Sequence, residues 1–179
     1  SAVLREVGIP SEFVSCLPNS VVAPDVLTLS LDDARRRVRA TFDLPSDARW
    51  CLYPVRGIRR KNVGELLLLS QLGRLDQYFG LTLAPATPIE ARSYQRWRQV
   101  SEQLTPRVVF GAGERSEVSF GCNLLASDSV VSTSVAEGFG MAFLEPWLLN
   151  REVIARRLPT VAEDFEASGM LLSKFYETA

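Results

Sequence analysis

The chain has 179 residues, which is enough for one domain with a substantial hydrophobic core. Its 20 basic and 21 acidic residues give a formal net charge of −1, which argues against general binding to nucleic acid or to an anionic membrane surface. Hydrophobic residues make up 46% of the chain. No apolar run approaches the roughly 20 residues that a transmembrane helix needs, so we expect a globular chain without a membrane segment.

The cysteine and histidine content of the chain indicates its cellular compartment and limits the chemistry that its side chains can perform. Cys16, Cys51 and Cys122 are odd in number and lie in apolar surroundings, which favours buried free thiols and a cytoplasmic location. The chain has no histidine and no cluster of metal-ligand residues, so we expect no bound metal. Because the sequence opens without an initiator Met or a signal pattern, we expect residues 1–179 to be a single domain of a longer protein.

The first part of the chain predicts a short strand and then a helix. The strand covers residues 13–17 and ends at the turn-forming residues Pro18, Asn19 and Ser20. Ser30, Asp32 or Asp33 caps a helix that runs to about Phe42. This helix carries a basic run, which we interpret as a solvated face rather than a binding site. The run consists of Arg35, Arg36, Arg37 and Arg39.

From residue 49 onward, runs of strand length alternate with segments of helical spacing. We expect strands at residues 49–55, 80–85, 107–111, 128–134 and 151–155. We expect helices at residues 62–77, 89–104, 116–125 and 140–150, and a helix or tail from residue 163. This alternation predicts the α/β class, with a Rossmann-like, doubly wound parallel sheet.

A basic loop follows the predicted strand at residues 49–55. Four of its six residues are cations, namely Arg56, Arg59, Arg60 and Lys61. Ligands of open α/β sheets bind beyond the carboxyl ends of the strands, which is where this loop lies. Guanidinium and ammonium groups both suit phosphate oxygens. Taken alone, however, an ordinary solvated loop explains the pattern better.

A glycine-containing segment, EGFGMAFLE, follows the predicted strand at residues 128–134. Gly138 and Gly140 permit a sharp turn and a close approach to a ligand, and the helix that follows offers free N–H groups to an anion. Glu137 and Glu145 repel phosphate, so their natural partners are the hydroxyl groups of a sugar or ribose. The alternative is an ordinary glycine turn followed by an acid near the start of a helix.

The segment EGFGMAFLE resembles the motif of two glutamates separated by seven residues in retaining glycosyltransferases of the GT-B architecture, the glycosyl transferases group 1 family. The spacing of Arg56 and Lys61 is similar to the family's Gly-Arg and Lys-Gly loop. PNSVV at residues 18–22 resembles its Pro-Asn-Gly-Val turn, and residues 151–164 resemble the segment after its donor helix. The four similarities occur in the family's order, and the chain therefore resembles the C-terminal, donor-binding half of a GT-B fold.

The resemblance implies a role for each matching residue. Arg56 and Lys61 hold the donor diphosphate and stabilise the charge on the departing nucleoside diphosphate. Glu137 accepts hydrogen bonds from hydroxyls of the transferred sugar, Glu145 holds the ribose, and the base lies near residues 109–113. The sugar or phosphate meets the backbone N–H groups of Gly138, Phe139, Gly140 and Met141.

The resemblance also implies an activity. The chain is expected to belong to a hexosyltransferase that moves a sugar from a nucleotide-diphosphate sugar to an unknown acceptor, with retention of configuration. The nucleotide sugar is then a substrate, no cofactor or metal is required, and an N-terminal acceptor-binding domain is missing. The alternatives are a sugar-nucleotide epimerase or synthase of the same fold and a non-catalytic nucleotide-binding module.

Three positions depart from the family pattern. Val55 and Asn62 stand where the family has the glycines that flank the Arg-to-Lys loop, and Thr133 stands where proline often precedes a serine. The side chain of Val55 either crowds a bound phosphate or points into the core. We expect Lys61→Ala to weaken diphosphate binding with little loss of stability, and Glu145→Ala to weaken nucleoside binding.

Overall fold

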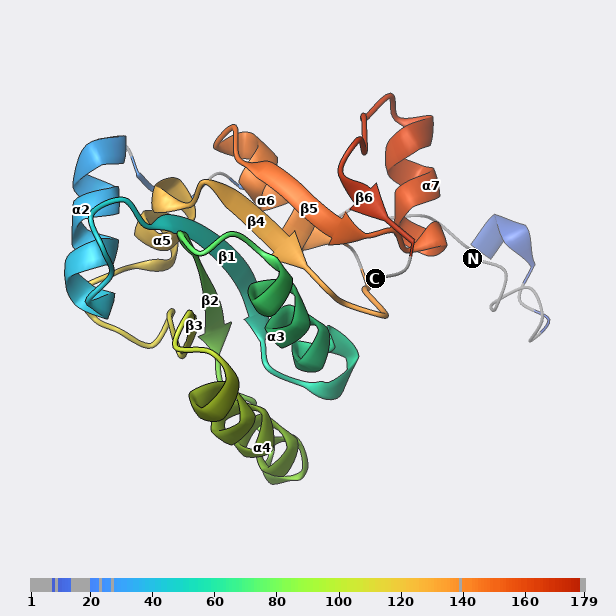
Figure 1. The fold of residues 1–179 in the computed structure, drawn as a ribbon. Coiled ribbons are helices and arrows are strands. Elements are labelled where there is room, and N and C mark those ends of the chain that lie inside the picture. The colour runs from blue at the N-terminus through green and yellow to red at the C-terminus, as the bar shows by residue number, and fades with distance from the viewer. Residues whose placement is uncertain are drawn as a thin grey trace.

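A six-stranded parallel sheet forms the centre of the structure (Figure 1). The computed structural model describes residues 8, 10–13, 20–22, 24–26, 28–138 and 140–177. The strands are β1 (Arg49–Arg56), β2 (Gln77–Leu83), β3 (Val108–Phe110), β4 (Ser129–Ser132), β5 (Glu152–Arg156) and β6 (Phe175–Tyr176). They lie in the order β3-β2-β1-β4-β5-β6, with every neighbouring pair parallel. This arrangement confirms the predicted Rossmann-like α/β class.

Helices connect the strands and cover the sheet. They are α2 (Leu31–Phe42), α3 (Val63–Leu72), α4 (Pro88–Leu104), α5 (Phe120–Ala126), α6 (Met141–Leu148) and α7 (Pro159–Ala167). Two short 3-10 turns are η1 (Ser11–Phe13) and η2 (Arg59–Lys61). Among the described residues, no helix is both long and apolar enough to cross a membrane.

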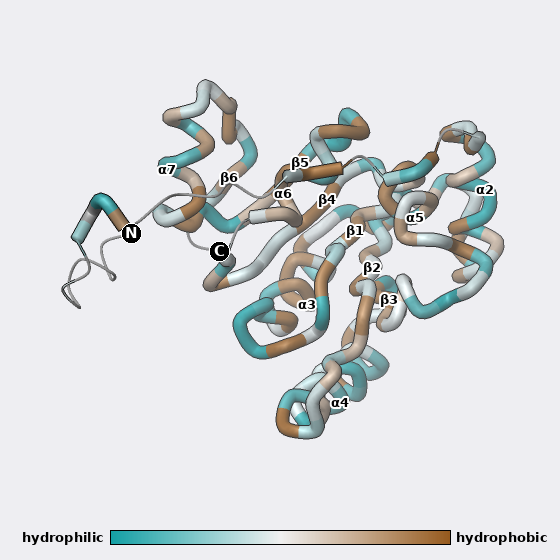
Figure 2. The backbone as a smooth tube through the Cα atoms, turned by 180° about the vertical axis from the view of Figure 1, so that it is seen from behind, coloured by the Kyte–Doolittle hydropathy of each residue, from teal (hydrophilic) through white to brown (hydrophobic). Residues whose placement is uncertain are grey.

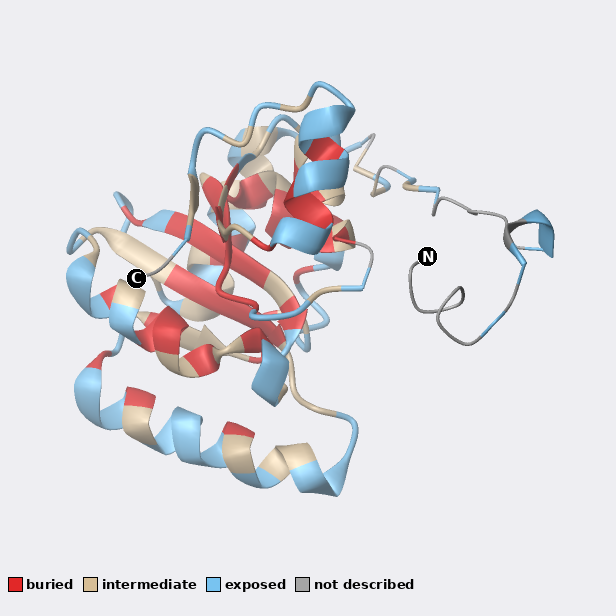
Figure 3. Cartoon of the chain, turned by 90° about the vertical axis from the view of Figure 1, so that its right-hand side faces the viewer, coloured by how far each residue is buried: buried red, intermediate tan, exposed pale blue. Residues whose placement is uncertain are grey.

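Alternate residues of β1 enter hydrophobic cores on opposite faces of the sheet, as a pleated strand requires. Tyr53 belongs to the core shared with α3 and α4, whereas Leu52 belongs to the core shared with α2 and α5. Both side chains are fully buried. A third core joins β5 to α6 and α7, where the ring of Phe143 meets that of Phe165 edge-on. The sheet is therefore covered on both faces (Figure 3).

The helix α2 begins and ends where the sequence predicts. The side chain of Ser30 accepts a hydrogen bond from the backbone N–H of Asp33, and Asp43 ends the helix in the left-handed conformation. Its basic run is only partly a solvated face. Arg36 and Arg37 are exposed, as predicted, but Arg35 Nη2 lies 2.7 Å from Asp128 Oδ1. The first arginine of the run, Arg35, therefore links α2 to the residue that precedes β4.

The helices α2 and α4 both alternate between hydrophilic and hydrophobic residues along their length (Figure 2). Such alternation is typical of helices with one covered and one solvated side. The most exposed long helix is α4, in which only Tyr94 and Ser101 are buried. Most of its surface is open to solvent (Figure 3).

Several predicted boundaries are wrong by a few residues. The helix predicted at 62–77 ends at Leu72, so that β2 begins at Gln77 rather than at residue 80. The helix predicted from residue 116 begins at Phe120, because the Ser119 side chain caps it there. Runs of apolar residues do not mark such ends, which capping and packing decide.

The chain ends also differ from the prediction. The helix α7 starts at Pro159 rather than near residue 163, and the short strand β6 was not predicted. Phe13 ends the turn η1 instead of opening a strand. Residues 14–17, Cys16 among them, lie outside the described residues, as do Pro18 and Asn19.

Candidate functional site

The loops that leave β1 and β4 meet at the point where the strand order reverses, which is where open α/β sheets bind ligands. The backbone N–H of Val135 donates to the carbonyl of Arg60 over 2.9 Å and joins the two loops. Beside them lies an open pocket of about 480 Å³. Seven of the predicted site residues line it, namely Arg56, Lys61, Glu137, Gly138, Gly140, Met141 and Glu145. Phe139 lies outside the described residues.

Lys61 and Glu137 form a buried ion pair in this pocket. The Nζ of Lys61 contacts Oε1 of Glu137, and each side chain is 8% exposed. Burial lowers the pKa of Lys61, while the carboxylate of Glu137 acts in the opposite direction and favours the charged ammonium. The Nη1 of Arg60 lies 3.6 Å from the other oxygen of Glu137. Glu137 is therefore held by two cations and places a negative charge on the floor of the pocket.

Two hydroxyl groups fix the backbone of Lys61. The hydroxyl of Tyr53 donates to the carbonyl of Lys61 over 2.7 Å, and Thr133 Oγ1 donates to the same carbonyl over 3.0 Å. Thr133 also lies 3.0 Å from the carbonyl of Asn62. Burial raises the pKa of Tyr53 to about 12, so its hydroxyl remains a donor at neutral pH. The threonine in place of the family's proline is thus a structural partner of the Lys61 loop.

Asn62 adopts the left-handed conformation, with φ of 48°. Asparagine tolerates this conformation better than most residues, which explains why it replaces a glycine at this position. Its side chain donates to the buried carboxylate of Glu65, which also contacts Arg156 and accepts from the hydroxyl of Tyr176 over 2.7 Å. This network connects the Lys61 loop to β5 and β6.

Sequence reasoning missed Tyr53 and Glu65, although both support the loop that carries Lys61. Tyr53 reads as an ordinary strand residue, and Glu65 reads as an ordinary acid in the first turn of a helix. The partners of Glu65, Arg156 and Tyr176, lie 91 and 111 positions away along the chain. A local sequence pattern cannot predict contacts between residues so far apart along the chain, so only the fold reveals them.

Val55 belongs to the core that β1 shares with α3, and 7% of its surface is exposed. Its carbonyl accepts a hydrogen bond from the hydroxyl of Thr82 over 2.9 Å. Val55 also lines the pocket beside Arg56, so its side chain both packs in the core and borders the space where a phosphate was expected.

The two glycines of the EGFGMAFLE segment differ in what they allow. Gly140 has φ of +68°, and a Cβ there would lie 2.7 Å from Val161 Cγ1. A Cβ on Gly138 would meet nothing within 4 Å. Gly140 is thus required by the backbone and by packing on α7, whereas Gly138 leaves the pocket wall open. Met141 then begins α6, whose first N–H groups lack partners within the helix.

The remaining charged residues of the pocket stand apart from the buried ion pair. Arg56 is exposed, and its Nη1 donates to the carbonyl of Ala84 over 3.1 Å. Burial raises the pKa of Glu145 in α6. Within the described ranges, no group of three or more cysteine, aspartate or glutamate residues is placed to hold a metal ion. The pocket therefore offers cations and the free N–H groups of a helix N-terminus, which suit phosphate oxygens, and carboxylates, which accept hydrogen bonds from hydroxyl groups. Together these groups suit a phosphorylated molecule that carries hydroxyl groups.

The chain has a Rossmann-like α/β fold with a pocket at the switch point of its sheet, and comparisons with known proteins narrow the class of protein. No family model matches the chain. Mannosylglucosyl-3-phosphoglycerate synthase from Petrotoga mobilis is 30% identical over 171 residues, which cover 91% of this chain. The chain spans 33% of the length of that relative.

Solved structures agree on the architecture. The C-terminal domain of the glycosyl transferase group 1 family protein LpcC from Francisella tularensis has a TM-score of 0.59 at 19% identity, over 86% of this chain and 88% of that one. The catalytic domain of starch synthase IV from Arabidopsis thaliana, solved with ADP and acarbose, has a TM-score of 0.57 at 16% identity. It matches 88% of this chain and 33% of its own. The predicted resemblance to the C-terminal domain of GT-B glycosyltransferases is confirmed as a likeness of fold.

Proposed function

We propose that this chain is the donor-binding domain of a retaining glycosyltransferase, a hexosyltransferase that uses a nucleotide-diphosphate sugar. The observation that carries the proposal is the buried pair of Lys61 and Glu137 at the reversal of the strand order. A buried charged pair costs free energy of desolvation, and a well-packed apolar pair would often be as stable. A pair open to a pocket is therefore more readily explained by ligand binding than by stability.

The proposed mechanism begins with an exchange of partners. When the donor enters, its diphosphate takes over the ammonium group of Lys61, while Arg56 neutralises the outer phosphate oxygens. Glu137, released from Lys61, accepts hydrogen bonds from hydroxyls of the sugar. The acceptor's hydroxyl oxygen bonds to the anomeric carbon as the bond between sugar and phosphate breaks, and its proton passes to the departing diphosphate, whose remaining negative charge the two cations stabilise. No bound metal or cofactor is required in this scheme, because the chain supplies the positive charge.

The start of α6 and Glu145 complete the donor site. The N–H groups at Gly140 and Met141 meet a phosphate or sugar oxygen, since the positive end of the helix dipole faces an anion there. Glu145 lies one turn further along α6 in the same pocket and accepts from ribose hydroxyls. The base lies near residues 109–113, after β3.

The acceptor-binding part of the enzyme is proposed to lie in a separate N-terminal domain. The chain spans 33% of the Petrotoga relative, whose name describes the synthesis of mannosylglucosyl-3-phosphoglycerate. A mannose donor and a phosphorylated acceptor are therefore the first pair to test. We also propose a cytoplasmic location, because Cys51 and Cys122 are buried free thiols.

Calorimetric titration of the chain with UDP, GDP, ADP and their sugar conjugates tests the donor site. We expect one nucleotide to bind selectively, and Lys61→Gln to weaken its binding by about tenfold or more, as the loss of a charged hydrogen bond predicts. Arg98→Gln is the matched control, since Arg98 is exposed on α4 and does not line the pocket. Equal affinity in Lys61→Gln, or no binding at millimolar concentration, would favour a non-catalytic module.

The chemistry itself requires the full-length protein. Transfer from a mannose or glucose nucleotide can be followed by NMR, and the anomeric configuration of the first product reports retention or inversion. An inverted product contradicts the retaining mechanism without affecting the donor site. Interconversion of sugar nucleotides without transfer would instead indicate an epimerase of the same fold.

A further inference from the structure

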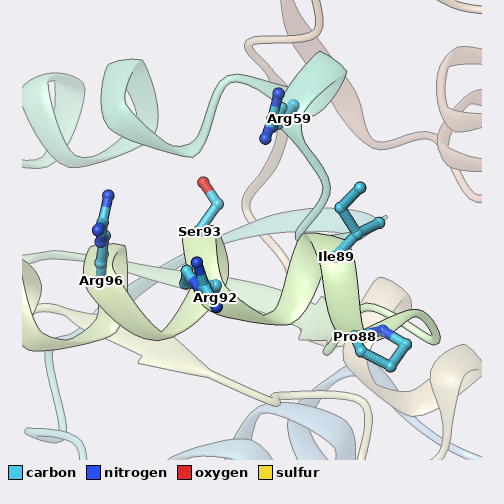
Figure 4. Close-up of a pocket in the computed structure, with 6 residues that line it drawn as sticks. All are labelled: Arg59, Pro88, Ile89, Arg92, Ser93 and Arg96. Atoms are coloured by element: carbon cyan, nitrogen blue, oxygen red, sulfur yellow. The ribbon is translucent and has the colours of Figure 1, made fainter.

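A second hollow lies beside the donor pocket, between η2 and α4. Its volume is about 620 Å³. It is lined by Arg59, Pro88, Ile89, Arg92, Ser93 and Arg96, none of which lines the donor pocket (Figure 4). Three of these six residues are arginines and none is acidic, so the lining carries three positive charges.

The three arginines of this hollow come from two elements. Ser93 and Arg96 point from α4 toward the side on which Arg59 lies, above the helix in this view (Figure 4). Arg92 and Arg96 are four positions apart and lie on the same side of α4, an arrangement of like charges that destabilises a helix. The structure nevertheless gathers these cations at one place.

None of the three guanidinium groups has a carboxylate partner within the part of the chain that the structure describes. Arg98, on the same helix, shows the contrast, because its Nε lies 3.5 Å from Glu102 Oε1. Glu90 of α4 contacts Arg59 through the backbone only, since its carboxylate accepts a hydrogen bond from the backbone N–H of Arg59 over 3.0 Å. The full donor capacity of the three side chains is therefore available to a ligand.

Close packing holds η2 and α4 together around the hollow. Gly57 lies directly against the ring of the buried Tyr94, where a Cβ would collide with it. Gly64 lies against Trp97 in the same way, with a Cβ position 2.7 Å from its ring. These two contacts flank Arg59 along the chain, so its position relative to α4 is fixed by the fold.

We propose that this hollow binds the phosphate group of a phosphomonoester or of a phospholipid head group. A phosphomonoester carries up to two negative charges and three terminal oxygens that accept hydrogen bonds, and the phosphodiester of a head group carries one charge and two such oxygens. Guanidinium groups donate two parallel hydrogen bonds to such oxygens, and the hydroxyl of Ser93 supplies a further donor. A bound phosphate also removes the repulsion between Arg92 and Arg96. The inference does not rest on the proposed donor site, because the two pockets share no lining residue.

Site-resolved NMR tests the proposal, with the Nε–H signals of the arginines as the readout. The probes are inorganic phosphate, glycerol 3-phosphate, and phosphatidylcholine vesicles with and without phosphatidylglycerol. We expect the signals of Arg59, Arg92 and Arg96 to shift together with a phosphate probe. The double variant Arg92→Gln with Arg96→Gln should weaken this binding at least about tenfold, since two charged hydrogen-bonding groups are lost. Its backbone spectrum shows whether the fold is kept, and Arg59→Gln provides a second variant.

The controls separate this site from general charge effects and from the donor pocket. Arg98→Gln removes one positive charge from another side of α4 and should change phosphate affinity less than twofold. Nucleoside diphosphate binding should be the same in the double variant and in the unaltered chain. Shifts with free phosphates assign the site to a small phosphomonoester, and binding only to vesicles with phosphatidylglycerol assigns it to a head group. If no probe shifts these arginines, or if Arg98→Gln weakens binding equally, the proposal is wrong.

Discussion

The ammonium group of Lys61 is buried against the carboxylate of Glu137, a residue 76 positions further along the chain. The loops after β1 and β4 carry these two residues, and the strand order places both loops on one side of the switch point. The pairing changes what a substitution of Lys61 does. Sequence reasoning predicts a small stability cost, because it treats Lys61 as a loop residue.

The first prediction concerns this ion pair. Lys61→Met should destabilise the chain by about 3 kcal/mol, because Glu137 then keeps a buried charge with only Arg60 nearby. The double variant Lys61→Met with Glu137→Leu should recover much of that loss, since no buried charge remains. Urea unfolding of the two single variants and the double variant measures the coupling. Additive effects would show that the pair is not energetically coupled.

The second prediction concerns the carbonyl of Lys61, which accepts from two hydroxyl groups. Tyr53→Phe and Thr133→Val each remove one donor and should cost about 1 kcal/mol of unfolding free energy. Together they should cost more than the sum, because the carbonyl loses both side-chain donors. Chemical denaturation of all three variants measures this difference. A sum without excess means that the two donors are independent.

The third prediction separates the glycines before α6. Gly140→Ala should destabilise the chain by about 3 kcal/mol, because it adds a side chain at positive φ and against Val161. Gly138→Ala is the matched control and should leave stability nearly unchanged, since the added methyl group meets nothing within 4 Å. Thermal unfolding distinguishes the two. Equal losses would contradict the assigned role of Gly140.

The sequence predicts the sheet, and the charged residues that line the pocket at its edge, because both have local signals. Apolar runs such as residues 49–55 mark strands, and charged residues directly after a strand end lie at the binding edge of a parallel sheet. The prediction fails where contacts are not local. The strand β6 has two residues and gains its place through its parallel pairing with β5. The partners of Glu65 likewise meet only after the sheet has formed.

The departures from the family pattern also show what sequence reasoning cannot predict. In the sequence, Asn62 and Thr133 depart from the family pattern at the Lys61 loop and at the loop after β4. In the structure, Asn62 supplies the left-handed conformation that a glycine would otherwise supply, and Thr133 donates to the loop's carbonyl groups. Both substitutions therefore keep the loop in place by other means, which the residue types alone do not show.

The fourth prediction concerns Glu145 and the pH dependence of stability. Burial raises the pKa of Glu145 above its ordinary value of 4.5, so the folded chain holds this proton more tightly than the unfolded chain does. The stability that this proton contributes is therefore fully present below the pKa of Glu145 in the unfolded chain. It is lost as the pH rises through the higher pKa of Glu145 in the folded chain. At neutral pH the ionised carboxylate carries the full desolvation cost.

Glu145→Gln removes this cost and should stabilise the chain at pH 7 by about 0.5 kcal/mol, a small gain because the side chain is only half-buried. The gain should disappear below about pH 4, where both states of the unaltered chain are protonated. The same variant should bind nucleoside diphosphate several-fold more weakly, because the ribose loses a charged acceptor. Unfolding curves at several pH values, combined with nucleotide titration, measure both effects. If Glu145 is retained for binding, Glu145→Gln should be more stable than the unaltered chain but bind the nucleotide more weakly. Unchanged affinity would mean that Glu145 is not part of the donor site.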